Sequence, residues 1–130
     1  MKVSELSGAL LNYWTGRAER ASFVGRIAEY TDGKTCCVVP AGVCGENGWT
    51  DQRIYSPSSD WSIGGPIIER EGLTVRTSVE PRTCLADDHN WRSCYHVGQH
   101  MAYGRTPLEA AMRSYVASKF GTDVPDEVPA

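Results

Sequence analysis

A chain of 130 residues, 41% of them hydrophobic and 22% charged, has the size and composition of a single globular domain. Its net charge of −3 argues against binding to duplex DNA, which needs many lysines and arginines on one face. No apolar run approaches the ~20 residues of a membrane-spanning helix, and the odd number of cysteines, 5, is typical of a reduced cytosolic protein.

The first predicted element is an amphipathic helix over residues 4–20. Apolar side chains recur there at helical spacing, and Ser4 is suited to cap the start of the helix. Glu5 interrupts the apolar run that a signal peptide would need. The apolar stripe must cover another element, which we expect to be a sheet. This stripe consists of Val3, Leu6, Leu10, Tyr13 and Trp14.

A hairpin-rich insert is predicted over residues 22–54. Two β-type runs flank Asp32 and Gly33, a residue pair that is typical of a hairpin turn. Glycines and a proline crowd residues 40–50, which we interpret as a surface loop. The predicted strands of this region are residues 23–27, 35–39 and 52–55.

Residues 57–72 predict a turn followed by a short helix. Ser59 or Asp60 can cap its start, and Pro66 suits the first turn of a helix, where a missing N–H group has no consequence. Gly72 is well placed to end the helix in a left-handed conformation.

The Gly64-Gly65 pair before Pro66 allows a second interpretation. Free backbone N–H groups at a helix start suit an anion. Pro66 removes one of these donors, however, and the spacing of a phosphate-binding P-loop is absent. A simple transition from loop to helix is the plainer alternative.

Antiparallel strands and a final helix complete the pattern. Thr106, Pro107 and Glu109 form a capping box with proline at the first helical position, and Gly121 ends this helix. An acidic, proline-containing tail over residues 123–130 is expected to be extended or disordered. The predicted strands are residues 73–79, 91–97 and 101–103, with a loop over residues 80–90.

This order of elements indicates an α+β domain over residues 1–122. A small antiparallel sheet would pack with two main helices and one short helix, and the insert at residues 22–54 would add hairpins.

Neither metal chemistry nor nucleophilic catalysis is favoured by the spacing of reactive residues. Among the cysteines and histidines, only His96 and His100 show the spacing of zinc ligands. Ser58 and Ser59 lie beside Asp60, but no histidine is placed by the sequence between a nucleophile and an acid. Their plainer role is to bond local backbone groups in a turn and a cap. We therefore expect no catalytic residues, no bound metal and no cofactor.

Arginines and aromatic residues form the set with the most functional potential. Together they can stack on bases and hold phosphates, and they are also common anchors of protein interfaces. Taken singly, each tryptophan is better explained as part of a core; Trp49, in a glycine-rich segment, is the best candidate for an exposed contact. The set consists of Trp14, Trp49, Trp61, Trp91, Tyr55, Tyr95, Tyr103, Arg70, Arg76, Arg82, Arg92, Arg105 and Arg113.

Three long stretches resemble the NinX-like family of tailed phages and their prophages. Residues 55–73 read Tyr-Ser-Pro-Ser-Ser-Asp-Trp-Ser-Ile-Gly-Gly-Pro-Ile-Ile-Glu-Arg-Glu-Gly-Leu, and residues 103–121 open with Tyr-Gly-Arg-Thr-Pro-Leu-Glu-Ala-Ala-Met. Residues 5–19 are similar to the first helix of that family. The resemblance implies an α-β-α sandwich and a phage accessory protein acting in the cytoplasm of the infected bacterium. It carries over no catalytic residues.

Two functions are compatible with these observations. The first is a non-enzymatic binder of a small nucleotide-like ligand, such as a sponge that sequesters a nucleotide immune signal of the host. Its expected site residues are Tyr55, Ser58, Asp60, Trp61 and Arg105. The alternative is a module that inhibits or recruits a host protein through a patch around Trp49. Pairing of an open sheet edge into a homodimer is also compatible with the sequence.

Overall fold

The computed structural model of the chain describes residues 1–20, 23–29, 33–44, 49–77, 91–95 and 99–125. These residues form two three-stranded antiparallel sheets, ordered β1-β2-β3 and β4-β5-β6, which confirms the predicted α+β class. The elements are a 3₁₀ turn η1 (Val3–Glu5), three helices α1 (Gly8–Glu19), α2 (Trp61–Glu71) and α3 (Pro107–Phe120), and the strands β1 (Arg26–Glu29), β2 (Thr35–Cys44), β3 (Trp49–Ile54), β4 (Thr74–Thr77), β5 (Trp91–Tyr95) and β6 (Gln99–Gly104).

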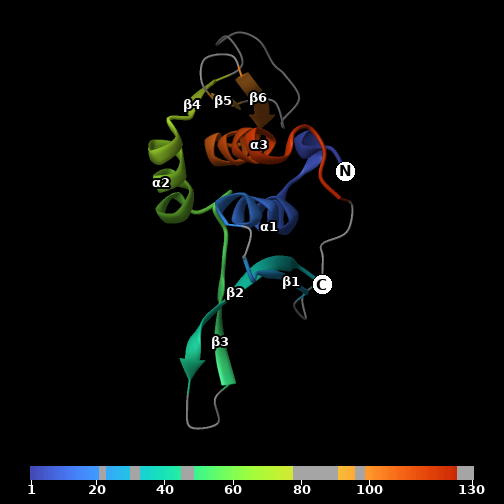
Figure 1. The fold of residues 1–130 in the computed structure, drawn as a ribbon, viewed down its shortest axis with the longest axis vertical. Coiled ribbons are helices and arrows are strands. Elements are labelled where there is room, and N and C mark those ends of the chain that lie inside the picture. The colour runs from blue at the N-terminus through green and yellow to red at the C-terminus, as the bar shows by residue number, and fades with distance from the viewer. Residues whose placement is uncertain (21–22, 30–32, 45–48, 78–90, 96–98, 126–130) are drawn as a thin grey trace.

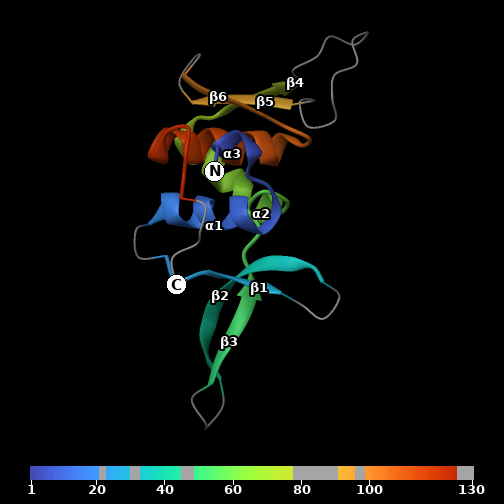
Figure 2. The same cartoon turned by 90° about the vertical axis from the view of Figure 1, so that its right-hand side faces the viewer.

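The helices form the middle of the molecule. In Figure 1 and Figure 2, β4-β5-β6 lies against α3, α1 lies on the other side of α3, and β1-β2-β3 follows below α1. The first sheet reaches the helices through β2, which packs against α1. The core lies between α1 and α3 and includes Leu6, Leu11, Trp14, Met112 and Tyr115, each at most 4% exposed.

The first two helices begin at other residues than the sequence predicts. The first helix begins at Gly8, because Ser4 belongs to the preceding turn η1. The second begins at Trp61, so Pro66 is its sixth residue, in the second turn. Proline lacks a backbone N–H group, so the Ser62 carbonyl has no hydrogen-bond donor within the helix. Both Pro66 and Ser62 are exposed, so water can hydrate that carbonyl and the helix continues.

The predicted loop over residues 40–50 is wrong where the structure describes it. Strand β2 continues to Cys44 and pairs with β3 from Trp49 onward. Turn-forming residues are accommodated because the register shifts between Pro40 and Gly42, a β-bulge that tolerates a proline. Residues 45–48 and the side chain of Trp49 lie outside the described part of the chain.

Helix ends follow the local signals closely. Asp60 caps α2 by accepting hydrogen bonds from the Ser62 N–H group at 2.9 Å and the Ser62 hydroxyl at 2.7 Å. These bonds lower the pKa of the Asp60 carboxyl. Gly72 ends α2 with a φ of 65°, and Thr106 caps α3 by accepting from the Glu109 N–H group at 3.1 Å. The predictions for these caps are confirmed.

The start of the predicted tail pairs with the beginning of the chain. Lys2 and Asp123 form an antiparallel bridge, and the Val124 N–H group donates to the Met1 carbonyl at 2.9 Å. Val124 is 5% exposed and packs into the core cluster. Residues 126–130 lie outside the described residues. Three further ranges outside them carry sequence predictions: the hairpin turn falls on residues 30–32, the predicted loop on residues 78–90, and the ends of two predicted strands on residues 78–90 and 96–98.

Candidate functional site

The five predicted site residues do not form one site. Ser58 and Arg105 line a single cleft of about 540 Å³, whereas Tyr55 lines a different one. Asp60 and Trp61 line neither. Asp60 is the cap of α2, and Trp61 is 57% exposed on that helix. The structure therefore does not bring Tyr55, Asp60 and Trp61 into the cleft that Ser58 and Arg105 line.

The cleft with Ser58 and Arg105, here called the α1–α3 cleft, lies between the starts of two helices. Gly8 and Ala9 come from the beginning of α1, and Arg105 and Thr106 from the beginning of α3. Hydroxyl groups dominate the rest of its polar lining. They belong to Thr35, Ser56, Ser58, Ser59 and Thr106.

Asn12 forms the base of the α1–α3 cleft and is 6% exposed. Its Oδ1 accepts two hydrogen bonds from Ser58, one from the N–H group at 3.0 Å and one from the hydroxyl at 2.6 Å. Within the described residues, its Nδ2 has no hydrogen-bond partner. Nδ2 is not fully buried, so it can donate to an acceptor that enters the cleft.

The charged groups of the cleft belong to one chain of contacts on α3. Glu109 Oε1 contacts Arg113 Nη2 at 3.1 Å, and Glu109 Oε2 lies 3.7 Å from Arg105 Nη2. Arg113 is 6% exposed, whereas the Arg105 side chain is 58% exposed. The buried pair leaves Arg105 as the loosely held cation at the cleft, available to a ligand.

Besides Arg105, the start of α1 provides backbone hydrogen-bond donors at the cleft. Ser7 is the N-cap residue, but its side chain makes no capping hydrogen bond. The first N–H groups of a helix have no partners within the helix, and they carry the positive end of its dipole. Together with Arg105 and Asn12 Nδ2, they make the cleft rich in hydrogen-bond donors. An anionic ligand with several acceptor oxygens suits such a lining.

A second cleft of about 630 Å³, the Tyr55 cleft, lies between the end of α1 and α2. Tyr55 and Phe23 pack there with ring centroids 5.2 Å apart. Burial, and to a smaller extent the charge of Glu19, raises the pKa of the Tyr55 hydroxyl, which therefore stays protonated. This cleft combines apolar and aromatic surface with the charged side chains of Glu19, Arg20 and Arg70.

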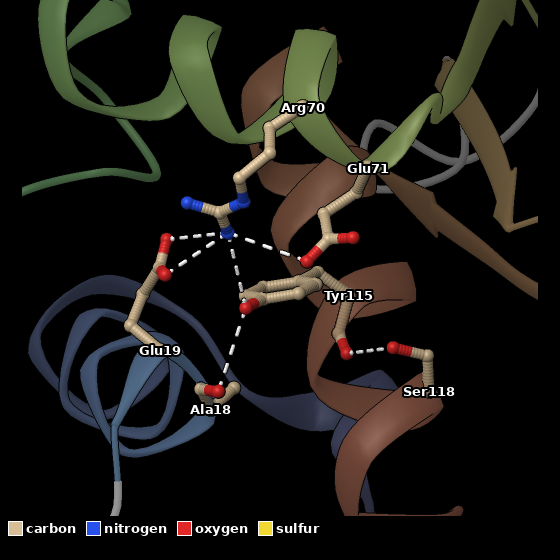
Figure 3. A network of polar contacts seen from close by, with 6 residues as sticks. All are labelled: Ala18, Glu19, Arg70, Glu71, Tyr115 and Ser118. Atoms are coloured by element: carbon tan, nitrogen blue, oxygen red, sulfur yellow. Dashed lines mark hydrogen bonds and ion pairs between the residues drawn. The ribbon is translucent and has the colours of Figure 1, made fainter.

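The central cation of the Tyr55 cleft is already compensated, as Figure 3 shows. Arg70 Nη2 contacts both carboxylate oxygens of Glu19, at 3.0 and 2.9 Å, and Glu71 Oε1 at 3.3 Å. The same nitrogen donates to the Tyr115 hydroxyl at 3.3 Å, so the cluster links α1, α2 and α3. The Glu19 hydrogen bonds raise the pKa of Arg70. Two carboxylates around one guanidinium make this cleft a poorer place for an anion than the α1–α3 cleft.

The anion-binding interpretation of Gly64 and Gly65 is not supported. Both residues lie inside α2, and the Gly64 N–H group donates to the Asp60 carbonyl at 2.9 Å. That donor is therefore occupied. The sequence analysis also missed Asn12, because an asparagine within an amphipathic helix gives no local sign that it is buried.

Two searches of the described residues gave negative results. Within the ranges that the structure describes, no three cysteine, histidine or acidic side chains gather where they could hold a metal ion. Cys84, His89 and His96 lie outside those ranges. No helix in the described part of the chain is long and apolar enough to cross a membrane.

Comparison with known proteins gave one match that spans nearly the whole chain. The sequence model of a family described as "Bacteriophage P22, NinX" matches residues 2–119. No curated protein matches the chain. The matched residues include both helix starts of the α1–α3 cleft and the turn that carries Ser58.

Proposed function

The chain belongs to the NinX family of bacteriophage P22, and from that membership and the α1–α3 cleft we propose a phage accessory protein that binds a small phosphate-containing ligand. The observation that carries the proposal is the unpaired Nδ2 of Asn12, which lies in the same cleft as Arg105. We propose a nucleotide-like ligand, such as a nucleotide immune signal of the host. Retaining that signal would make the protein an anti-defence sponge in the host cytoplasm.

Each part of such a ligand has a counterpart in the cleft. A phosphate would accept hydrogen bonds from Arg105 and from the first N–H groups of α1, and Asn12 Nδ2 would bond a second oxygen. Ile54, which is 52% exposed at the edge of the cleft, offers apolar surface to a base. Hydroxyl groups such as that of Ser59 would bond a sugar.

Binding without chemical turnover is part of the proposal. The Ser58 hydroxyl donates to the Asn12 amide oxygen, which is not basic and cannot activate a nucleophile. The ligand would therefore be held and released unchanged. Whether the protein forms a homodimer stays a prediction, which light scattering on the purified chain would test.

Removal of the Arg105 side chain should weaken ligand binding without unfolding the protein. One charge-assisted hydrogen bond contributes about 1.5–3 kcal/mol, so Arg105→Ala should reduce affinity by about 10-fold or more. The ion pair of this exposed side chain with Glu109 spans 3.7 Å, so stability should change by less than about 1 kcal/mol. Arg20→Ala removes an exposed arginine outside this cleft and serves as the matched control.

The measurement combines ligand release with thermal unfolding. Denaturation of the purified protein followed by mass spectrometry identifies any bound molecule, and a panel of cyclic and linear nucleotides is screened for stabilisation. At 100 times its Kd, a ligand adds about 2.7 kcal/mol, a shift in Tm on the order of 10 °C for a chain of this size. Absence of both a released molecule and a stabilising nucleotide would refute the proposal.

A further inference from the structure

The β4-β5-β6 sheet has one face against α3 and one face without a helix. In Figure 2, α3 lies beneath the sheet and no helix of the described chain lies above it. Ser93 and Ala102, which are paired across β5 and β6, are 2% and 8% exposed, so this pair faces the helix side. Because side chains alternate along a strand, their neighbours Arg92 and Tyr103 point to the open face.

Two arginines and a tyrosine form a row across that open face. Arg76 is paired with Arg92, and Arg92 is paired with Tyr103. Directly opposed positions on neighbouring strands bring side chains within contact distance, and strands lie roughly 4.8 Å apart. The row therefore places two arginine positions beside one tyrosine position on the same face.

The two arginines are unfavourable for folding as they stand. Like charges directly opposite each other destabilise a sheet. Within the described residues, neither Arg76 nor Arg92 has a hydrogen bond or an ion pair that would compensate the repulsion. The other described side chains of this face, including Thr74 and Cys94, carry no negative charge. Among the described side chains, this face is therefore cationic, although the chain as a whole has a net charge of −3.

Apolar and aromatic surface adjoins this charge on the edge strand. Tyr103 is 38% exposed and Met101 is 46% exposed, and the Tyr103 hydroxyl contacts Met101 Sδ at 3.5 Å. An exposed ring next to cations can stack a base while the cations hold the adjoining phosphates. We propose that the open face of the β4-β5-β6 sheet binds single-stranded nucleic acid.

Single strands fit this face better than duplex DNA or an acidic protein. Bases of a duplex are paired and stacked inside it, so Tyr103 could not stack on them, and two arginines provide too little charge for tight binding of a duplex backbone. An acidic peptide would match the arginines but offers no base to stack on the ring of Tyr103. This face is separate from the α1–α3 cleft, so the inference does not depend on the ligand proposed there.

The test is fluorescence anisotropy with labelled 12-nucleotide oligo-dT and oligo-U and with a duplex of the same length. We expect the single strands to bind more tightly than the duplex. The logarithm of the binding constant should fall with the logarithm of salt concentration by about 0.7 for each phosphate held. Failure of both single strands to bind at low salt overturns the proposal, as does tighter binding of the duplex.

Substitutions of the two arginines test whether the row is the binding site. Arg92→Thr should weaken single-strand binding at least about fivefold and reduce the salt slope by about 0.7, while Tm stays the same or rises because the opposed charges are removed. Arg76→Thr should have the same effect at a fully exposed position. Arg20→Ala is the control for loss of one positive charge. Unchanged binding in both threonine variants overturns the proposal.

The ring is tested by a matched pair of variants. Tyr103→Ala should weaken binding about tenfold through loss of stacking, whereas Tyr103→Phe should retain it. Equal affinity of these two variants would refute a stacking role. Polyglutamate is the competitor that distinguishes the partners, because displacement of the oligonucleotide by polyglutamate at equal charge concentration would point to an acidic protein and overturn the proposal.

Discussion

Replacement of Arg113 by methionine is expected to lower the free energy of unfolding by about 3–5 kcal/mol. Arg113 is 6% exposed and its guanidinium joins three parts of the fold. Nε donates to the Leu6 carbonyl at 2.8 Å, Nη1 donates to the Tyr103 carbonyl at 2.7 Å, and Nη2 pairs with Glu109 at 3.1 Å. Methionine fills a similar volume but donates no hydrogen bond, so two carbonyls lose this donor and the Glu109 carboxylate loses the closer of its two arginines.

Urea denaturation measures this loss, and a second variant separates its causes. In the double variant Glu109→Gln, Arg113→Met, the carboxylate charge that Arg113 neutralises is absent as well. The loss of stability in the double variant should therefore be smaller than the sum of the losses in the two single variants. Arg105→Ala, on the exposed side of the same carboxylate, should cost less than about 1 kcal/mol. A loss below about 1 kcal/mol for Arg113→Met would contradict a structural role for this cluster.

Adjacent glycines of α2 are expected to respond in opposite directions to alanine. A Cβ atom at Gly64 would overlap the Pro57 carbonyl oxygen and lie 2.7 Å from Leu108 Cδ2. The turn and α2 would have to separate, so Gly64→Ala should destabilise the fold by about 1–3 kcal/mol or more. At Gly65 the nearest atom to a Cβ is Trp61 Cε3 at 3.7 Å, an ordinary contact. Gly65→Ala should therefore stabilise the helix by up to about 1 kcal/mol.

Thermal unfolding of the two variants in parallel provides the comparison, because both changes add one methyl group to the same helix. Equal Tm values would show that α2 is not packed tightly against the turn at Pro57. A loss of stability at Gly65 as large as that at Gly64 would mean that glycine is needed at both positions for another reason.

Features that depend on neighbouring residues in the sequence could be predicted. Asp60, Thr106 and Gly72 mark helix ends through bonds and dihedral angles within a few residues, so each cap could be inferred from its local pattern. The continuation of β2 beyond Pro40 depends instead on its partner β3. Glycines and a proline there resembled a loop, because the sequence does not show which strand lies alongside.

In the candidate site, too, contacts between residues distant in the sequence could not be predicted. Ser58 and Arg105 were predicted to share a site and line one cleft, although 46 residues separate them. That prediction came from their chemistry, whereas the role of Asn12 depends on a long-range contact with Ser58. Tyr55 follows Ile54 directly, but the two residues line different clefts. A change of side from one residue to the next is not apparent until the register of β3 is known.

The unequal burial of α3 and the β1-β2-β3 sheet has a consequence for how the α1–α3 cleft opens. Nine consecutive residues of α3, from Leu108 to Val116, are buried, whereas in the β1-β2-β3 sheet only Cys37 and Val38 are buried among the side chains described. Segments with few buried contacts open locally while the rest of a protein stays folded. Thr35, Cys36 and Ile54 belong to that less buried sheet and form one wall of the cleft. Fluctuation of this wall would admit and release a ligand without disturbing the helices that hold Arg105 and Asn12.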